Sequence, residues 1–443
     1  MPFRIAAVQM NTQADKAESL RKAGALIDEA AALGADLVAL PEMFNVYGTA
    51  REIREGREPL GGETSRFLQA KAREHGIYVH GGSIPVLVAE DGSSDKAWNM
   101  TLVYDPAGEL IASEVEFKTT AHDRYGPAAA MLAAGRRRVI DAAGTLGMAV
   151  AVTGVHPFSA WTDQRIIDTP HYRVVEGELG YIAWINNTWA THLHCGVRGA
   201  DRAVRVSTAM RSVLPELLAL SANSPLYARR DTRMASARTQ LFVRSFPRCG
   251  IPDAFTSWDD YARHVRLLEA SGSIQESTQI WWSVRPHHAY GTVEVRICDG
   301  QTEMSHTAAV MALALACIAQ FCADLDEGRE VPVHARSLIE ENLWRAQRHG
   351  LDGQLIDLDT GVVRSAADAI RELLDRTATR HDRLGLSPYL ASIRDMLDHG
   401  NGAQRQRGLF QRLHGDTRAV HAVAVERTAA SADEFLASHN HEG

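Results

Sequence analysis

The stretch GTVEVRICD, residues 291–299, decides how the second half of this chain is interpreted. Its alternating pattern predicts a β-strand in which Glu294 and Arg296 share one face, while the valines and isoleucine between them take the other. An isolated Glu-x-Arg pair on a strand is most simply explained as a surface ion pair. The neighbouring sequence therefore has to show whether this pair has a ligand.

Two further predicted strands present polar groups on one face. HLHC, residues 192–195, places His192 and His194 together, and WWSVRPH, residues 281–287, offers Arg285. Taken alone, such side chains are commonly satisfied within the protein, but a core sheet does not carry this many charges without a partner or ligand. Carboxylate and imidazole for divalent cations, with guanidinium for phosphate or carboxylate, are typical of an ATP-using ligase.

Length and composition exclude several classes of protein. With 443 residues the chain is expected to form two domains. A net charge of -8 gives no basic footprint for nucleic acid. Five cysteines without paired spacing and a start that turns polar early predict a cytoplasmic protein with reduced thiols. The longest apolar stretch, residues 308–319, is too short for a bilayer and predicts a buried helix, so no membrane partner is expected.

The first 112 residues differ in pattern from the rest. Predicted strands and helices alternate there, which indicates a layered α/β unit. All five lysines lie at or before Lys118, and this uneven usage agrees with a boundary near residue 112. The domains predicted are thus an incomplete N-terminal segment, 1–112, a second domain, 113–428, and a frayed tail, 429–443.

Residues 3 to about 112 resemble the first half of the nitrilase, or carbon–nitrogen hydrolase, superfamily. The words that carry the resemblance are RIAAVQ, LVALPEMF and NMTLVYDPAGEL. The resemblance makes Glu42 the general base for a cysteine nucleophile assisted by a lysine. Lys118 comes two places after the expected position and no matching cysteine motif follows, so Glu42 is interpreted as a structural remnant.

Residues from about 113 to about 428 resemble the bacterial glutamate–cysteine ligase and carboxylate–amine ligase family, relatives of glutamine synthetase. The matching words are TGVHPFSAW, HLHCGV, LPELLALSANSP, FPRCGIP, WWSVRPHHAYGTVEVRICD and ENLWRAQRHGLDGQLID. The resemblance implies an α+β fold, with an antiparallel sheet of glutamine synthetase type flanked by helices and preceded by a truncated nitrilase-like α/β segment. It also implies that ATP and Mg²⁺ bind over the polar face, where an amino-acid carboxylate is phosphorylated and then attacked by an amine to form an amide.

Site roles follow from the same resemblance, position by position. The metal ligands would be Glu294, Glu116 and His194. The residues clamping phosphate or substrate carboxylate would be Arg285, Arg296 and Arg238. The nucleotide-binding residues would be His192, His194, Asn223 and Arg285.

Three departures from the family pattern qualify this reading. The acidic first strand of the family is replaced by nitrilase-like sequence, Arg229 and Arg233 stand in a loop that is normally glycine-rich, and Ser283 stands where an acidic residue is common. Three functions stay open: an ATP-dependent carboxylate–amine ligase, a catalytically silent nucleotide- or amino-acid-binding protein, and a nitrilase-type amidohydrolase. The carboxylate and amine substrates, and whether the chain forms a homo-oligomer, are not fixed by the sequence.

Local patterns also predict individual elements. Residues 201–222 read as one long amphipathic helix, and residues 258–270 as a second helix capped by Ser257. Residues 148–153 read as an apolar strand. The segments 365–385 and 387–407 read as two amphipathic helices that pack back onto the second domain.

Overall fold

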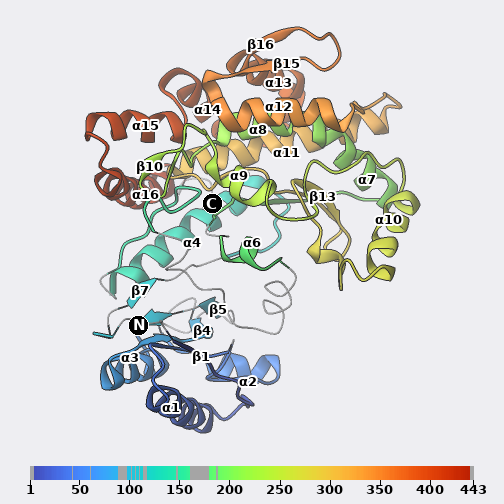
Figure 1. Ribbon diagram of the computed structural model, residues 1–443. Coiled ribbons are helices and arrows are strands. Elements are labelled where there is room, and N and C mark those ends of the chain that lie inside the picture. The colour runs from blue at the N-terminus through green and yellow to red at the C-terminus, as the bar shows by residue number, and fades with distance from the viewer. Residues whose placement is uncertain are drawn as a thin grey trace. The chain divides into compact units, whose positions relative to one another are not determined.

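The computed structural model describes residues 4–41, 43–59, 61–87, 97–100, 102–104, 106–108, 110–112, 117–145, 148–159, 179–185 and 188–439 (Figure 1). Two predicted site residues, Glu42 and Glu116, lie outside these residues. The chain divides into two compact units. Unit 1 takes its described residues from 1–119, 134–150 and 161–184, and unit 2 from 120–133, 151–160 and 185–443.

Unit 1 is a mixed sheet with helices. Its described five-stranded sheet has the order β1-β2-β3-β6-β7, with β1 to β3 parallel and the last two pairings antiparallel. The strands are β1 (Ile5–Ala7), β2 (Leu37–Ala39), β3 (Tyr78–His80), β6 (Val103–Tyr104) and β7 (Leu110–Ala112), and β4 (Ile84–Leu87) pairs with β5 (Ala97–Met100) as a separate ladder. The helices are α1 (Lys16–Ala32), α2 (Ala50–Glu55), α3 (Glu63–His75) and α6 (Tyr181–Trp184). The predicted alternation of strands and helices is confirmed.

Helix α1 shows why this alternation arises from the sequence. The Asp15 side chain accepts a hydrogen bond from the Glu18 amide and so caps the first turn. Apolar residues at helical spacing, Leu20, Ala23 and Ile27, are buried in the core of the unit. The resulting amphipathic helix needs a sheet or helix to cover its apolar face, and α1 contacts α3 and β2.

Unit 2 is built mainly of helices around one three-stranded antiparallel sheet. Its sheet has the order β13-β14-β8, formed by β13 (Val284–His287), β14 (Thr292–Val295) and β8 (Leu193–Gly196). The short paired strands are β9 (Leu226–Tyr227), β10 (Arg230–Asp231), β11 (Cys249–Gly250), β12 (Trp281–Trp282), β15 (Gln354–Ile356) and β16 (Val363–Ser365). A mixture of helix and sheet is therefore confirmed, whereas a sheet of glutamine synthetase type stays a prediction.

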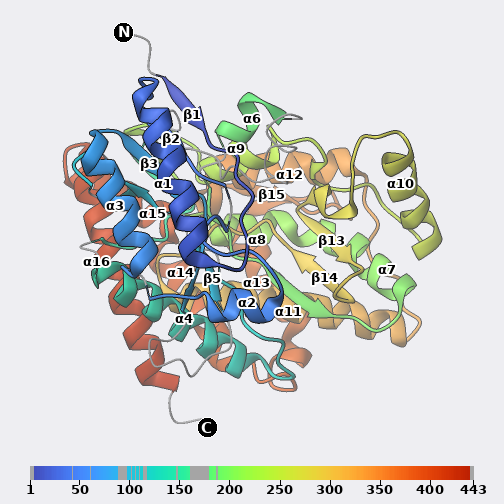
Figure 2. The same ribbon diagram turned by 90° about the horizontal axis from the view of Figure 1, so that it is seen from below.

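The helices of unit 2 pack around this sheet and against one another. They are α7 (Ala200–Met210), α8 (Leu214–Ser221), α9 (Ala237–Val243), α10 (Trp258–Ala270), α11 (Met304–Asp326), α12 (Arg336–His349), α13 (Ala366–His381), α14 (Ser387–His399), α15 (Gly402–Arg412) and α16 (Thr417–His439). Helix α4 (Tyr125–Thr145) divides its residues between the two units. Helix α7 packs against β13 and β14, as Figure 2 shows. The predicted helix 258–270 is confirmed, including the Ser257 cap, whose hydroxyl accepts a hydrogen bond from the Asp260 amide.

The prediction of one helix over residues 201–222 was wrong, because the segment forms two helices. Helix α7 ends at Met210, the turn Arg211–Val213 is a 3₁₀ helix, and α8 begins at Leu214. Pro215 stands in the first turn of α8, where its missing N–H costs nothing, whereas inside a continuous helix it would break the hydrogen-bond ladder. The break places Arg211 at the corner between the two helices.

Helix α11 is long and apolar, and it is a core helix. It is the one described helix that could cross a bilayer by length and composition, but 61% of its most apolar window is buried inside the protein. Its apolar residues, including Val310, Leu313 and Ile318, lie in the core of unit 2. The prediction of a buried helix over 308–319 is confirmed.

Two other predictions of local structure were wrong. Residues 148–153 form no strand; the nearest pairing is an isolated bridge between Val155 and Thr188. The second predicted C-terminal helix divides into α14 and α15, because Gly400 has φ 90° and Asn401 caps the next helix with its side chain.

The predicted frayed tail also requires correction. Residues 429–439 continue α16, and Ala432 and Phe435 are 0% and 4% exposed. The Phe435 ring packs into the core of unit 2 near Tyr389. Residues 440–443 lie outside the described part of the chain.

Phe435→Ala is expected to lower the free energy of unfolding by about 3–5 kcal/mol, because it removes a buried ring and leaves a cavity. Urea denaturation measures this change. Glu434→Ala on the same helix is the control, since Glu434 is 61% exposed and its ion pair with Arg427 should contribute less than about 1 kcal/mol. Equal stability of the two variants would mean that this end of α16 does not pack.

Candidate active site on the polar face of the sheet

The polar face of the β13-β14-β8 sheet is centred on the carboxylate of Glu294. The strand register places Arg285 opposite Glu294 on one side and His194 opposite it on the other. Val293 and Val295 point to the opposite face and are fully buried in the core. The alternation predicted from GTVEVRICD is confirmed, and it brings side chains from three strands together.

Glu294 is held by two guanidinium groups. The Arg285 Nε donates to Glu294 Oε2 at 2.6 Å, and the Arg296 Nη1 donates to Oε1. Arg285 also donates through Nη1 to the carbonyl oxygens of Thr278, at 3.0 Å, and Ile280. Burial would raise the pKa of Glu294, but the charges of Arg296 and Arg285 outweigh it and lower that pKa to about 2. The carboxylate is thus ionised throughout the physiological range.

Two histidines approach the same carboxylate oxygen. His194 Nε2 lies 3.6 Å and His192 Nδ1 lies 3.9 Å from Glu294 Oε1. Desolvation, reinforced by the positive charge of Arg296, lowers the pKa of His192 well below its ordinary value. A neutral His192 carries a free lone pair, so it can accept a proton or a hydrogen bond.

An aromatic rim continues the polar face beyond His194. The His287 ring stacks on Tyr290 with centroids 4.5 Å apart and meets His194 edge-on at 5.4 Å. Tyr290 is 64% exposed. These two rim residues were not predicted, although His287 follows Arg285 by two positions and could have been recognised from strand alternation.

Among the residues that the structure describes, the polar face carries more positive charge than negative. Two guanidiniums share the single carboxylate of Glu294, and Arg296 Nε is buried with no hydrogen-bond partner in the described part of the chain. Ser283 lies next to Arg296, whose backbone N–H donates to the Ser283 carbonyl oxygen. The Ser283 hydroxyl is also buried and has no hydrogen-bond partner among the described residues. Unused buried donors beside excess positive charge are suited to an anionic ligand.

Arg238 and Asn223 lie in a separate buried network centred on Asp299. Arg238 donates to the carbonyls of Ile297 and Arg296 at 3.0 and 3.1 Å, and its Nη1 is 3.6 Å from Asp299 Oδ1. Asn223 is fully buried, and its side chain donates to the carbonyls of Val152 and Gly300. The structure therefore brings Arg285, Arg296, His192 and His194 to Glu294, whereas it gives Arg238 and Asn223 bonds that support the backbone.

The described residues do not by themselves form a magnesium site. Mg²⁺ prefers several oxygen ligands, and the polar face offers the carboxylate of Glu294, both of whose oxygens already accept hydrogen bonds from arginine. Glu116, expected to be a second metal ligand, lies outside the described residues.

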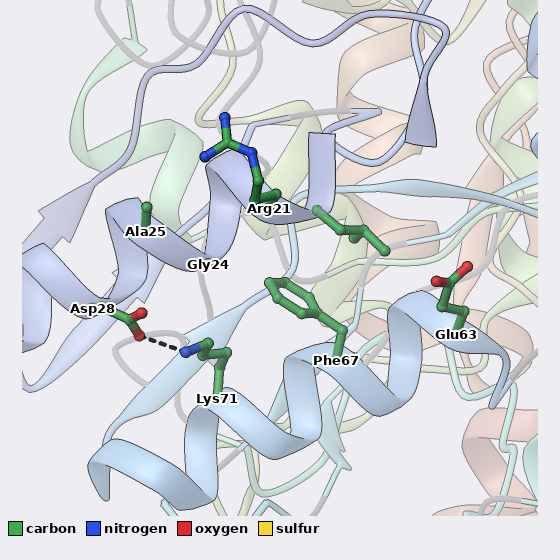
Figure 3. Close-up of a pocket in the computed structure, with 8 residues that line it drawn as sticks. Arg21, Gly24, Ala25, Asp28, Glu63, Phe67 and Lys71 are labelled. Carbon is green, nitrogen blue, oxygen red and sulfur yellow. Dashed lines mark hydrogen bonds and ion pairs between the residues drawn. The ribbon is translucent and has the colours of Figure 1, made fainter. Parts of the chain in front are cut away.

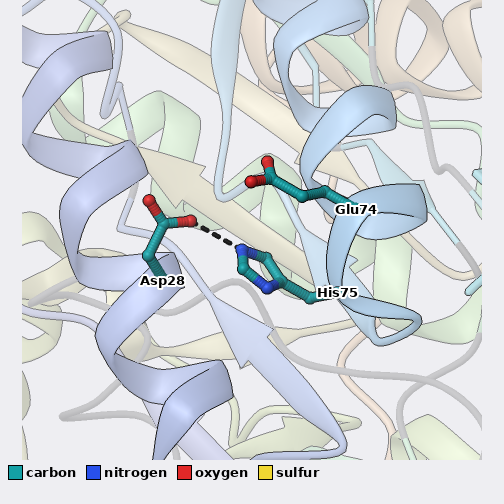
Figure 4. Close-up of side chains that lie close together, drawn as sticks. All are labelled: Asp28, Glu74 and His75. Atoms are coloured by element: carbon teal, nitrogen blue, oxygen red, sulfur yellow. Dashed lines mark hydrogen bonds and ion pairs between the residues drawn. The ribbon is translucent and has the colours of Figure 1, made fainter.

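A different group of possible metal ligands occurs in unit 1. The side chains of Asp28, Glu74 and His75 lie close together, as Figure 4 shows, and His75 Nε2 is 2.6 Å from Asp28 Oδ1. Lys71 donates to Asp28 at 2.6 Å and to Glu74 at 2.8 Å. Because the lysine ammonium already supplies the cation between these carboxylates, the group is explained as an ion-pair cluster.

A shallow hollow of about 500 Å³ adjoins this cluster between α1 and α3. Figure 3 shows Phe67 and Lys71 of α3 facing Gly24 and Asp28 of α1. A side-chain carbon at Gly24 would meet the Phe67 ring at 3.4 Å, an ordinary van der Waals contact, so the packing here does not require glycine. The hollow is an open groove between two helices, and two of its charged residues, Asp28 and Lys71, are already paired with each other.

Comparison with known proteins assigns the family. The model of glutamate–cysteine ligase family 2 matches residues 86–428. The chain belongs to this family. The carbon–nitrogen hydrolase model matches residues 4–161, so the two matches overlap and the N-terminal resemblance is also confirmed.

Two curated relatives of this ligase-family chain support the assignment. A Rubrobacter xylanophilus protein with the provisional name glutamate–cysteine ligase 2-2 is 35% identical over 84% of this chain and 92% of its own length. A Solibacter usitatus protein with the provisional name glutamate–cysteine ligase 2 is 36% identical over 66% of this chain and 76% of its own. Among solved structures, Nit3 of Saccharomyces cerevisiae, a nitrilase superfamily member, is 21% identical over 32% of this chain and 72% of that chain, with a TM-score of 0.24.

The arginine loop that departs from the family pattern has a strained backbone. Strands β9 and β10 are joined by Ala228 and Arg229, whose φ angles are 49° and 63°. Positive φ at both central residues is the condition of a type I′ turn, which normally takes Asn-Gly. Arg233 has φ 60° as well, so the two arginines occupy a left-handed conformation that suits glycine.

Arg229→Gly is expected to raise the free energy of unfolding by about 1 kcal/mol, because glycine adopts positive φ without strain. Thermal or urea denaturation would detect the gain. Arg230→Gly is the matched control: it lies in β10, where glycine should destabilise by a similar amount. A loss of stability in both variants would show that Arg229 makes a compensating interaction.

Glu294→Gln should remove a pH-dependent contribution to stability. The folded pKa of about 2 lies below the ordinary value of 4.5, so the ionised carboxylate stabilises the fold above pH 4.5, and this stabilisation is lost as the pH falls towards 2. Between pH 7 and pH 3 the wild-type advantage over the variant should shrink by about 2 kcal/mol. Urea titrations at these two pH values measure this change, and a constant difference would contradict the ion pairs of Glu294.

Proposed function

We propose that this chain is an ATP-dependent carboxylate–amine ligase that forms an amide bond through an acyl phosphate. Membership of glutamate–cysteine ligase family 2 supports ligase chemistry in general. The observation that supports ATP-dependent chemistry is that Arg285 and Arg296 both form ion pairs with the carboxylate of Glu294. Two positive charges against one negative charge leave positive charge and unused donors for anionic substrates.

The residues of the polar face suit both substrates of the first step. The amino-acid substrate presents a carboxylate, and ATP presents phosphates, and guanidinium groups bind either ion in a fork geometry. A carboxylate oxygen attacks the γ-phosphorus and the bond from that phosphorus to the bridging oxygen breaks, so ADP leaves. Arg296 and Arg285 would stabilise the negative charge that spreads over the phosphoryl oxygens.

The second step needs a base. The amine nitrogen attacks the acyl carbon, the proton that it loses must be accepted, and inorganic phosphate leaves. We assign this role to His192, because its ring is neutral and the Glu294 carboxylate, 3.9 Å away, would stabilise the imidazolium that forms when the ring takes the proton. MgATP would bring its magnesium as part of the substrate, and no step is assigned to the metal because the described residues do not form its site.

A catalytically silent binding protein is the second candidate. Both oxygens of Glu294 are already engaged by arginine, and Ser283 stands where the family commonly has a carboxylate. Such a face would bind an anionic nucleotide or amino acid without completing a metal site. The ligase proposal requires turnover, so the two functions differ in a direct assay.

Amide hydrolysis by a nitrilase mechanism receives no support from the cysteines. Desolvation raises the pKa of Cys195 and Cys249 to about 12, so both are protonated and poor nucleophiles at neutral pH. All five cysteines are free of disulfides, which supports our proposal of a cytoplasmic location. We also propose amino-acid carboxylate and amine substrates, with no nucleic acid or membrane partner.

Purified protein incubated with ATP, Mg²⁺ and a panel of amino acids and amines should release ADP and phosphate in step with amide formation. Arg296→Ala and Arg285→Ala should each lower kcat/KM by at least about 100-fold, because a charge-assisted contact to the transition state is lost. Arg263→Ala is the matched control, since Arg263 is 74% exposed on α10. Saturable ATP binding without ADP release across the panel would instead support the silent binding protein.

A further inference from the structure

The strongest unexplained feature outside the polar face is the buried guanidinium of Arg211. This residue lies at the corner between α7 and α8 and is 1% exposed. Among the described residues it has the largest volume of any fully buried side chain. Its Nη2 donates to the carbonyl of His334 at 3.2 Å. Its Nε and Nη1 are buried and have no hydrogen-bond partner in the described part of the chain. Unmade hydrogen bonds to a buried charge are costly, so these two donors require an explanation.

A small cavity lies against this guanidinium. Arg211 lines it together with Ser207 of α7, which is 5% exposed and whose hydroxyl is also buried and unpartnered among the described residues. The cavity has a volume of about 10 Å³, close to the space that one water-sized sphere occupies. Three unused donors therefore border a space for a single small particle.

The other walls of the cavity supply one carboxylate, which is exposed and shared with a second arginine. Apolar side chains, among them Val204, Phe255 and Val284, line it. Asp253 also lines it, but this carboxylate is 63% exposed and accepts a hydrogen bond from Arg336 at 3.5 Å. No described carboxylate forms an ion pair with Arg211. The cavity is thus positively charged, polar on one side and apolar on the others.

Electrostatics around the cavity point in the same direction. Burial lowers the pKa of Arg211, Asp253 opposes this shift, and the second guanidinium, Arg336, adds to it. Arg336 itself is paired with Glu340. A neutral water molecule could accept one of the hydrogen bonds, but it would leave the buried charge without compensation.

We propose that this cavity is a binding site for a small monatomic anion of the halide class, held by Arg211 Nε and Nη1 and by the Ser207 hydroxyl. The one-sided arrangement of the three donors against apolar walls suits a small spherical ion. The site is distinct from the polar face, because Ser207 and Arg211 lie on the helical side of the sheet.

The position of the site gives it a consequence for catalysis, which rests on the proposed ligase function. Val284 and Pro286 of β13 line the cavity, whereas Arg285 between them points to Glu294 on the opposite face. Thr208 exchanges two hydrogen bonds with Phe255 and so fixes the adjoining wall. A bound halide would therefore support the strand segment that presents Arg285 to substrate.

The test combines a structural and a solution measurement. Crystals of the full chain grown in bromide should show an anomalous peak within hydrogen-bond distance of Arg211 and Ser207. In solution, chloride should raise the melting temperature by about 2 °C relative to gluconate at equal ionic strength. Arg211→Met should abolish the chloride effect, and Ser207→Ala should weaken it, which keeps the test informative if the first variant fails to fold.

Arg205→Met is the matched control, because Arg205 is exposed on the same helix and its loss should leave the chloride effect unchanged. An ordered water without an anomalous peak would overturn the proposal. So would a bromide peak without any chloride dependence in solution, or an equal chloride effect in wild type and Arg211→Met. These readouts do not involve turnover, so their failure is distinguishable from failure of the ligase proposal.

Discussion

The arrangement of unit 2 depends on one buried charge, the carboxylate of Asp299. This side chain is fully buried and accepts hydrogen bonds from the Asn223 backbone N–H at 2.9 Å, the Ser224 hydroxyl at 2.6 Å and the Ser236 hydroxyl at 2.9 Å. Burial raises the pKa of Asp299, and Arg238 opposes that shift. Because an uncompensated buried carboxylate costs several kcal/mol, the segments that supply these donors cannot move apart without a large penalty. The end of α8, the start of α9 and the strand end after β14 are joined in this way.

The position of the polar face follows from that constraint. Arg238 donates to the carbonyls of Arg296 and Ile297, so the network fixes the backbone from which the Arg296 side chain reaches Glu294. Asn223 and Arg238 thus act through the backbone in this structure, while Arg285 and Arg296 contact the carboxylate directly. Buried polar networks of this kind hold functional groups in place only when their members are satisfied, and Asp299 meets this condition with three hydrogen bonds and one ion pair.

Buried arginines on the two sides of the small sheet differ in whether a carboxylate pairs with them. On the polar face, Arg285 and Arg296 share the carboxylate of Glu294. On the helical side, Arg211 has no such partner among the described residues and borders a cavity of about 10 Å³. The two anion sites that we propose both adjoin β13, on its opposite faces. The departures from the family pattern, Ser283 and the strained turn at Arg229, leave the ion pairs of Glu294 in place.

The sequence by itself determined the family, the N-terminal resemblance, the alternation of GTVEVRICD and the buried helix α11, because these rest on local periodicity and on long runs of matching residues. It did not determine the break at Pro215, the continuation of α16 to His439, or the network around Asp299. The break at Pro215 has a local cause, whereas the other two features arise from contacts between residues tens of positions apart or more, such as Asp299 with Asn223 and Phe435 with Tyr389. Local pattern fixes which face of a strand a side chain takes, but only the tertiary structure decides which distant donor satisfies a buried charge and which charge is left for a ligand.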